Sequence, residues 1–206
     1  MKQCCEDKAH ELVVLRNRQG RVLWIVFGIN TVMFFVELVA GLLASSTALL
    51  ADSFDMFGDA TVYAFTLFVL NRSLTWRTRA VRLKAVIMAA FGIGVLIEAV
   101  VKLFSATVPI ASTMGTIGIA ALIANLICLW LLLQHRNDDL NMRSTWLCSR
   151  NDIIANVGVL VAAALVWFTN TNWPDVLIGS AIAAVFLASS FTVLMESRAG
   201  SPATTG

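Results

Sequence analysis

Three aspartates lie at helical spacing inside an apolar segment, in the string ALLADSFDMFGDA. Asp52, Asp55 and Asp59 are separated by three and four residues, which places them on one stripe of an α-helix. Ionisable residues are costly inside a bilayer and mark functional positions by default. Three carboxylates on one stripe cannot all stay ionised without a cation. The pattern therefore favours a metal or proton site over a cluster of purely structural hydrogen bonds.

A second apolar segment repeats this spacing, in the string WLCSRNDIIANVGVL. Cys148 and Asp152 are four residues apart, so they share one face of a helix. Two such pairs on two facing helices would supply four oxygen and sulfur donors, which suits a tetrahedral divalent cation of the zinc type. The predicted ligand set is Asp55, Asp59, Cys148 and Asp152.

Other polar or thiol residues could support this site. Candidates for a supporting or pathway role are Glu37, Asp52, Asn151 and Asn156. For Glu37 a packing role fits equally well. Near the N-terminus, Cys4, Cys5 and His10 either capture a soft metal ion or belong to an unstructured tail, and the sequence leaves both readings open. We expect Cys128 to be a small packing residue and His135 to be solvated.

The elements that must position these residues are six apolar runs, each close to the roughly 20 residues that cross a bilayer. The runs are Val22–Leu43, Thr47–Leu70, Ala85–Phe104, Met114–Leu133, Thr145–Phe168 and Val176–Met195. Of the 206 residues, 58% are hydrophobic and 14% are charged, which excludes a disordered chain, a coiled coil and an ordinary soluble enzyme. The net charge of +2 gives no argument for a nucleic-acid partner. We therefore predict an all-α, polytopic membrane protein with six transmembrane helices.

Charge predicts the orientation of this protein in the membrane. All of the 15 Lys and Arg residues except Lys102 lie in the two terminal segments and in the loops on the same side. The positive-inside rule then places both termini in the cytoplasm. The predicted organisation is a cytoplasmic segment at 1–21, a transporter domain at 22–195 and a short cytoplasmic tail at 196–206. Lys102 is predicted to pair with Glu98, four residues earlier, and to snorkel to the interface.

The block from Asn30 to Tyr63 and the string RNDIIANVGVLVAA resemble the cation diffusion facilitator family. The resemblance implies a six-helix exporter, usually dimeric, that exchanges a divalent cation for protons. Asp55, Asp59 and Asp152 match family ligand positions, whereas Cys148 stands where the family usually has His. The chain has no room for the family's usual C-terminal cytoplasmic domain, so we expect a short member.

The expected function is export of divalent transition metals, Zn2+ or Cd2+, from the cytoplasm in exchange for protons. We expect a homodimer in the bilayer of a cell membrane, bacterial and inner, with no prosthetic group and no nucleic acid. The sequence is also compatible with two alternative functions. One is an intramembrane aspartyl protease whose dyad is Asp59 and Asp152, and the other is a metal channel without proton coupling.

Overall fold

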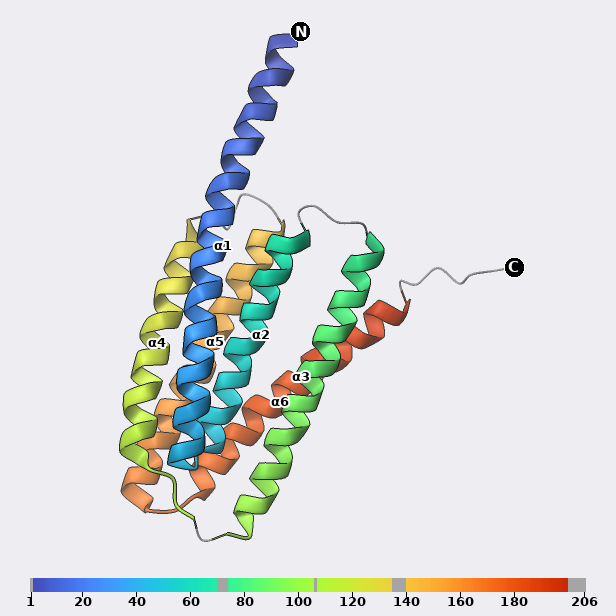
Figure 1. Ribbon diagram of the computed structural model, residues 1–206. Helices are drawn as coiled ribbons and strands as arrows, with labels where there is room; N and C mark the ends of the chain where they lie inside the picture. Colours follow the sequence, from blue (N-terminus) through green and yellow to red (C-terminus); the bar gives the residue numbers. More distant parts are fainter. Residues whose placement is uncertain (1, 70–73, 106, 135–139, 200–206) are drawn as a thin grey trace, which may run out of the picture.

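The computed structural model describes residues 2–69, 74–105, 107–134 and 140–199. For some helical residues the structure describes the backbone but not the side chain, namely 2–19, 62, 65–69, 74–85, 140–151, 189, 192–194 and 196–199. The described residues form six α-helices and no strand, which confirms the all-α fold (Figure 1). The helices are α1 (Lys2–Ala44), α2 (Thr47–Val69), α3 (Leu74–Leu103), α4 (Ala111–Leu133), α5 (Leu140–Thr169) and α6 (Trp173–Ala199).

Four of these helices extend well beyond their apolar runs. α1 begins at Lys2 instead of Val22, α3 at Leu74 instead of Ala85 and α5 at Leu140 instead of Thr145, while α6 continues to Ala199. Hydropathy identifies only the part of a helix that contacts lipid. The helical hydrogen bonds continue beyond that part, through Glu, Lys, Arg, Gln and Leu, because these residues favour helix in water. Residues 2–21 are therefore part of α1, and the interpretation of these residues as an unstructured tail is wrong.

Apolar helices make this a multi-pass membrane protein. In the part of the chain that the structure describes, four segments are long and apolar enough to cross a bilayer: Gly20–Ala44, Val86–Leu103, Ala111–Leu133 and Asp152–Thr169. Trp173–Ala188 is a shorter apolar stretch. α2 has 23 residues and carries the three aspartates. Large apolar side chains such as Leu43, Phe104 and Phe168 are exposed, as expected for surfaces that meet lipid.

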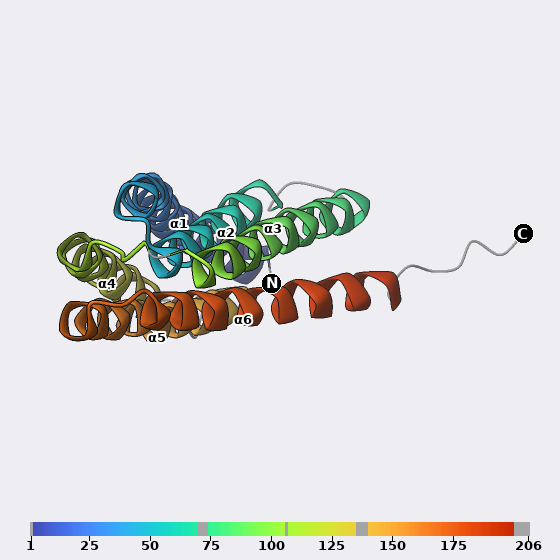
Figure 2. The ribbon, with the colours of Figure 1, turned by 90° about the horizontal axis from the view of Figure 1, so that it is seen from below.

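The helices run alternately up and down, so both ends of the described chain lie on the same side (Figure 1). Seen from below, α1, α2 and α3 form one row and α5 and α6 form a second, with α4 beside α1 and α5 (Figure 2). α2 occupies the middle of the assembly and contacts α1, α3, α5 and α6. Which side of the membrane holds the termini stays a prediction.

The turn between α1 and α2 lies at the end of the bundle opposite the termini. Ser45 has a positive φ of 51°, and the Ser46 N–H donates to the Gly41 carbonyl at 2.9 Å while the Ser45 N–H donates to the Leu42 carbonyl at 3.3 Å. This pair of bonds is the Schellman arrangement that ends a helix. The turn brings the N-terminus of α2 directly against α6.

Asp175 of α6 caps the N-terminus of α2. Its carboxylate accepts hydrogen bonds from the Ser46 hydroxyl at 2.6 Å, the Thr47 N–H at 2.7 Å and the Ala48 N–H at 3.0 Å. The side chain is fully buried. The first N–H groups of a helix have no partner within it, so this carboxylate satisfies them and complements the helix dipole.

Lys102 joins α3 to the same cluster. The predicted ion pair with Glu98 is present at 2.9 Å, but the predicted snorkelling is wrong because Lys102 is only 7% exposed. Its Nζ donates to the Ser45 carbonyl at 2.7 Å and lies 3.9 Å from an oxygen of Asp175. A buried ammonium needs such partners. Helices α1, α2, α3 and α6 are thus tied together at the end opposite the termini.

Candidate metal centre

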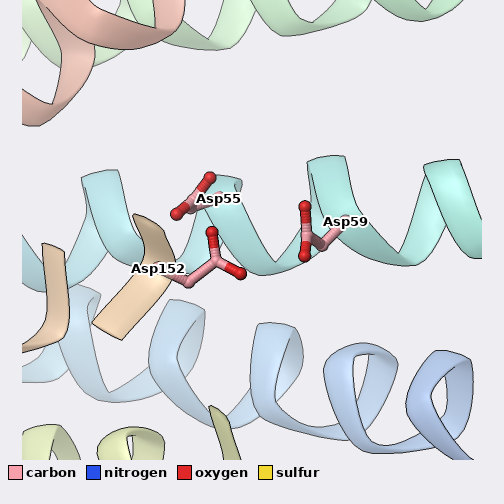
Figure 3. Close-up of side chains that lie close together, drawn as sticks. All are labelled: Asp55, Asp59 and Asp152. Carbon is pink, nitrogen blue, oxygen red and sulfur yellow. The ribbon is translucent and has the colours of Figure 1, made fainter. Parts of the chain in front are cut away.

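Three aspartates from two helices converge in the middle of the bundle. Asp55 and Asp59 project from α2 toward Asp152 on α5 (Figure 3). One carboxylate oxygen from each lies within 4.8 Å of the others. Asp59 and Asp152 are 8% and 7% exposed, and Asp55 is partly buried. Carboxylates this close together repel, and a divalent cation or protons would offset that repulsion.

Helical geometry and packing explain why these side chains meet. Asp55 and Asp59 are one turn apart on α2, so both face the same direction. α2 packs against α5, which carries Asp152. The Asp175 cap holds the start of α2, two turns before Asp55, against α6. The carboxylates therefore sit on elements whose positions are set by the fold.

Tyr63 orients one of the carboxylates and was missed by sequence reasoning. Its hydroxyl donates to Asp59 Oδ2 at 2.7 Å, and the side chain is 1% exposed. This hydrogen bond fixes the orientation of the Asp59 carboxylate next to Asp55 and Asp152. The signal was available, because Tyr63 is the single tyrosine of the chain and follows Asp59 by four residues.

Three of the predicted supporting residues, Glu37, Asp52 and Asn156, are buried outside the group of three carboxylates. Asp52 does not join that group, although it lies on α2 with Asp55 and Asp59. Its Oδ1 accepts a hydrogen bond from Asn156 Nδ2 at 3.2 Å, and the same amide nitrogen donates to the Asp152 carbonyl at 2.9 Å. Glu37, Asp52 and Asn156 are all fully buried. Asn156 thus connects the helix that carries Asp152 to Asp52.

Several predicted residues lie outside the described side chains, namely Cys4, Cys5, His10, Cys148 and Asn151. His135 lies outside the described residues altogether. The backbone of α5 is helical from Leu140, so Cys148 stays a prediction as the residue one turn before Asp152. Cys128 is fully buried in a cluster with Leu23, Val26, Tyr63 and Leu132, which confirms its packing role.

The chemistry of the described cluster is that of a cation site. Carboxylate oxygens bind hard and borderline divalent ions, and three of them from two helices leave a position for a further ligand. A thiolate in that position would shift the preference toward zinc and cadmium. The described geometry supplies the oxygen ligands of such a site.

Comparison with known proteins places this chain in a family. The family profile described as "Cation efflux transmembrane domain" matches residues 23–80 and 76–199. The chain belongs to the cation diffusion facilitator family. Members of this family are metal transporters rather than typical enzymes, so the family does not support the protease alternative.

Relatives of this cation diffusion facilitator include proteins named for metals. A zinc transporter, ZitB, from Yersinia pestis is 28% identical over 88% of this chain. A cadmium, cobalt and zinc/H(+)-K(+) antiporter from Bacillus subtilis is 29% identical over 86% of this chain. A metal cation efflux system protein, CzcD, from Cupriavidus metallidurans is 27% identical over 85%. The chain spans 62%, 61% and 62% of the length of these relatives, respectively.

Proposed function

We propose that this cation diffusion facilitator exports divalent transition-metal ions, Zn2+ or Cd2+, from the cytoplasm in exchange for protons. The observation that carries the proposal is the convergence of Asp55, Asp59 and Asp152 within 4.8 Å, in the middle of a membrane bundle. The relatives are named for zinc, cadmium and cobalt, and one is named as an antiporter with H+ and K+. The metal ion is the substrate, and it binds between α2 and α5.

Proton exchange follows from the chemistry of the ligands. Carboxylates and a thiolate bind metal only when deprotonated, so protons and metal ions compete for the same groups. The site loads metal while it faces the cytoplasm and takes up protons when it faces outward. Moving two positive charges outward against 100 mV costs about 4.6 kcal/mol, at ~2.3 kcal/mol per charge. Inward movement of protons down their gradient offsets this cost.

Cys148 completes the ligand set in this proposal and determines which metal is preferred. A thiolate is a softer donor than the imidazole usual at this position in the family, so it favours cadmium and zinc over manganese and magnesium. Asp55, Asp59 and Asp152 then provide the remaining ligands, with Asp59 held in place by Tyr63. A tetrahedral arrangement of these four donors suits zinc.

The assembly and location are also part of the proposal. We propose a homodimer that associates through its membrane helices, because small residues allow close helix packing in lipid. The bacterial relatives favour the inner membrane. Native mass spectrometry in mild detergent with lipid tests this assembly, and a monomeric mass under those conditions would contradict the dimer.

Transport by purified protein tests the proposed function. Proteoliposomes are loaded with a metal-sensitive dye, and uptake of zinc, cadmium and manganese is followed with and without an imposed pH gradient. We expect zinc and cadmium uptake that depends on the gradient and that is lost in Asp55→Ala and Asp152→Ala. Glu98→Gln is the matched control, because it removes a carboxylate from a partly exposed ion pair away from the three aspartates.

Two outcomes would contradict the proposal. Metal uptake that does not depend on the pH gradient would indicate an uncoupled channel instead. Normal uptake by both folded aspartate variants would show that the metal binds elsewhere.

A further inference from the structure

Glu37 and Asp52 form a buried carboxyl pair outside the three-aspartate cluster. Glu37 lies on α1 and Asp52 on α2, and both side chains are fully buried. α1 packs against α2, and Glu37 lies about two turns before the turn between these helices while Asp52 lies about one and a half turns after it, so the two carboxyl groups come from the same level of the bundle. Among the described atoms, no donor reaches either oxygen of Glu37 or Oδ2 of Asp52. Two groups that can only accept hydrogen bonds when ionised are therefore buried at the same level of two neighbouring helices.

The surroundings of the pair supply little positive charge. In the described part of the chain, α1, α2 and the helices packed against them carry nine other titratable side chains: Arg21, Asp55, Asp59, Tyr63, Glu98, Lys102, Cys128, Asp152 and Asp175. Of the two cations, Arg21 is exposed and lies about four helical turns from Glu37, and Lys102 is already engaged by Glu98 and the Ser45 carbonyl. Asn156 Nδ2 donates to Asp52 and leaves its own Oδ1 without a donor. Two buried carboxylates without a cation would be very costly.

We propose that Glu37 and Asp52 hold one exchangeable proton between them, as a second site that is separate from the metal ligands. A single proton turns one carboxyl group into a donor, and the facing carboxylate accepts its hydrogen bond. This inference rests on the proposed function, since the proton matters only if a metal ion binds nearby. The pair thus carries a proton that the metal ligands themselves do not account for.

The position of the pair couples it to the metal centre. Asp52 precedes Asp55 by three residues, which is a rise of about 4.5 Å along α2. Asn156 bonds both to Asp52 and to the backbone of Asp152, so it links the two sites. When a divalent cation binds to Asp55, Asp59 and Asp152, its two positive charges stabilise the ionised form of the pair, and the proton leaves to water. When the metal departs, the pair takes up a proton again. The pair lies one turn closer than the metal centre to the end opposite the termini.

The test counts the protons released when zinc binds to the full chain in lipid nanodiscs. Zinc is titrated in a weak buffer that contains a pH-sensitive dye, and the zinc affinity is measured over a range of pH. We expect Glu37→Gln to bind zinc within about threefold of the unaltered chain but to release about one proton fewer per metal ion. The slope of log Kd against pH should fall by about one in the same variant. Glu98→Gln is the matched control and should release as many protons as the unaltered chain.

A second variant and a second readout keep the test decisive. Asp52→Asn removes the other half of the pair and should show the same deficit, even if Glu37→Gln fails to insert. Infrared difference spectra should show loss of protonated-carboxyl absorption when zinc is added to the unaltered chain, and a loss smaller by about one carboxyl group in either variant, because the metal ligands also release protons. An unchanged proton count, slope and infrared band in folded variants would overturn the proposal. If the variants release fewer protons than the unaltered chain only when sodium or potassium is the bulk cation, then the pair binds an alkali ion. That result would also overturn the proposal. If the unaltered chain binds no zinc, the proposed function itself fails.

Discussion

Replacing Asp175 with alanine should strongly destabilise the protein, because this carboxylate holds the start of α2. The change removes the acceptor for the Ser46 hydroxyl and for the N–H groups of Thr47 and Ala48. The site is fully buried, so water does not replace the lost acceptor. Each buried donor left without a partner costs about 1–3 kcal/mol.

We therefore expect Asp175→Ala to lower the free energy of unfolding by about 3 kcal/mol. This figure takes the two backbone donors near the middle of that range, and it allows the Ser46 hydroxyl to find another acceptor. For a chain of this size the loss corresponds to a fall in Tm of about 6–12 °C. Asp175→Asn keeps the shape and one carbonyl oxygen, so its Tm should lie between those of the alanine variant and the unaltered chain.

Thermal unfolding in detergent, followed by circular dichroism, measures this change. Glu98→Gln is the comparison, because it breaks an ion pair whose carboxylate side chain is 33% exposed. Lys102 is buried, but it keeps the Ser45 carbonyl as an acceptor and can still donate to the amide oxygen of the new glutamine, so the Tm should fall by no more than a few degrees. If Asp175→Ala unfolds at the same temperature as Glu98→Gln, then Asp175 does not cap α2 and the reasoning from these distances is wrong.

Three further predictions concern single side chains. Tyr63→Phe should weaken zinc binding by about 10-fold or more, because Asp59 loses the hydroxyl that orients it. Isothermal titration calorimetry measures the Kd for zinc, and an unchanged Kd would show that the hydroxyl does not orient Asp59. Gly179→Ala should lower the Tm, because a Cβ there would lie 2.7 Å from the backbone carbonyl carbon of Thr47, and a Tm equal to that of the unaltered chain would contradict the close contact. Cys148→His should keep zinc transport and lose the relative preference for cadmium, while Cys148→Ser should weaken transport of both metals. If Cys148→Ala leaves the cadmium-to-zinc transport ratio unchanged, Cys148 is not a metal ligand.

The helices themselves were predictable, but their full lengths were not. Apolar composition located α2 and α4 to within a few residues, since these helices are almost entirely within the apolar runs. It underestimated α1, α3, α5 and α6, because hydropathy carries no information about a helix that continues into water. The break at Ser45 and Ser46 was predicted from composition, whereas the left-handed conformation of Ser45 appears only in the structure.

Part of the candidate site could be anticipated from spacing and part could not. Two residues four apart on one helix share a face, so Asp55 and Asp59 could be paired from the sequence. That Asp152 faces them depends on how α5 packs against α2; the repeated four-residue spacing in the second apolar segment supplied that expectation, and the family resemblance agreed with it. The cap by Asp175 joins residues more than 120 positions apart, and no local pattern signals such a contact.

The length of α1 constrains how its N-terminal end could deliver a metal ion. The helix has 43 residues, which corresponds to about 64 Å at ~1.5 Å per residue. Its apolar part, Gly20–Ala44, accounts for about 37 Å of this length. The remainder forms a straight arm that projects beyond the other helices (Figure 1), and Cys4 and Cys5 belong to the far end of that arm. A metal ion held there would be roughly 20 Å of helix away from Gly20, too far to pass directly to Asp55 and Asp152. Delivery from such a position would require the ion to be released and to diffuse back toward the bundle.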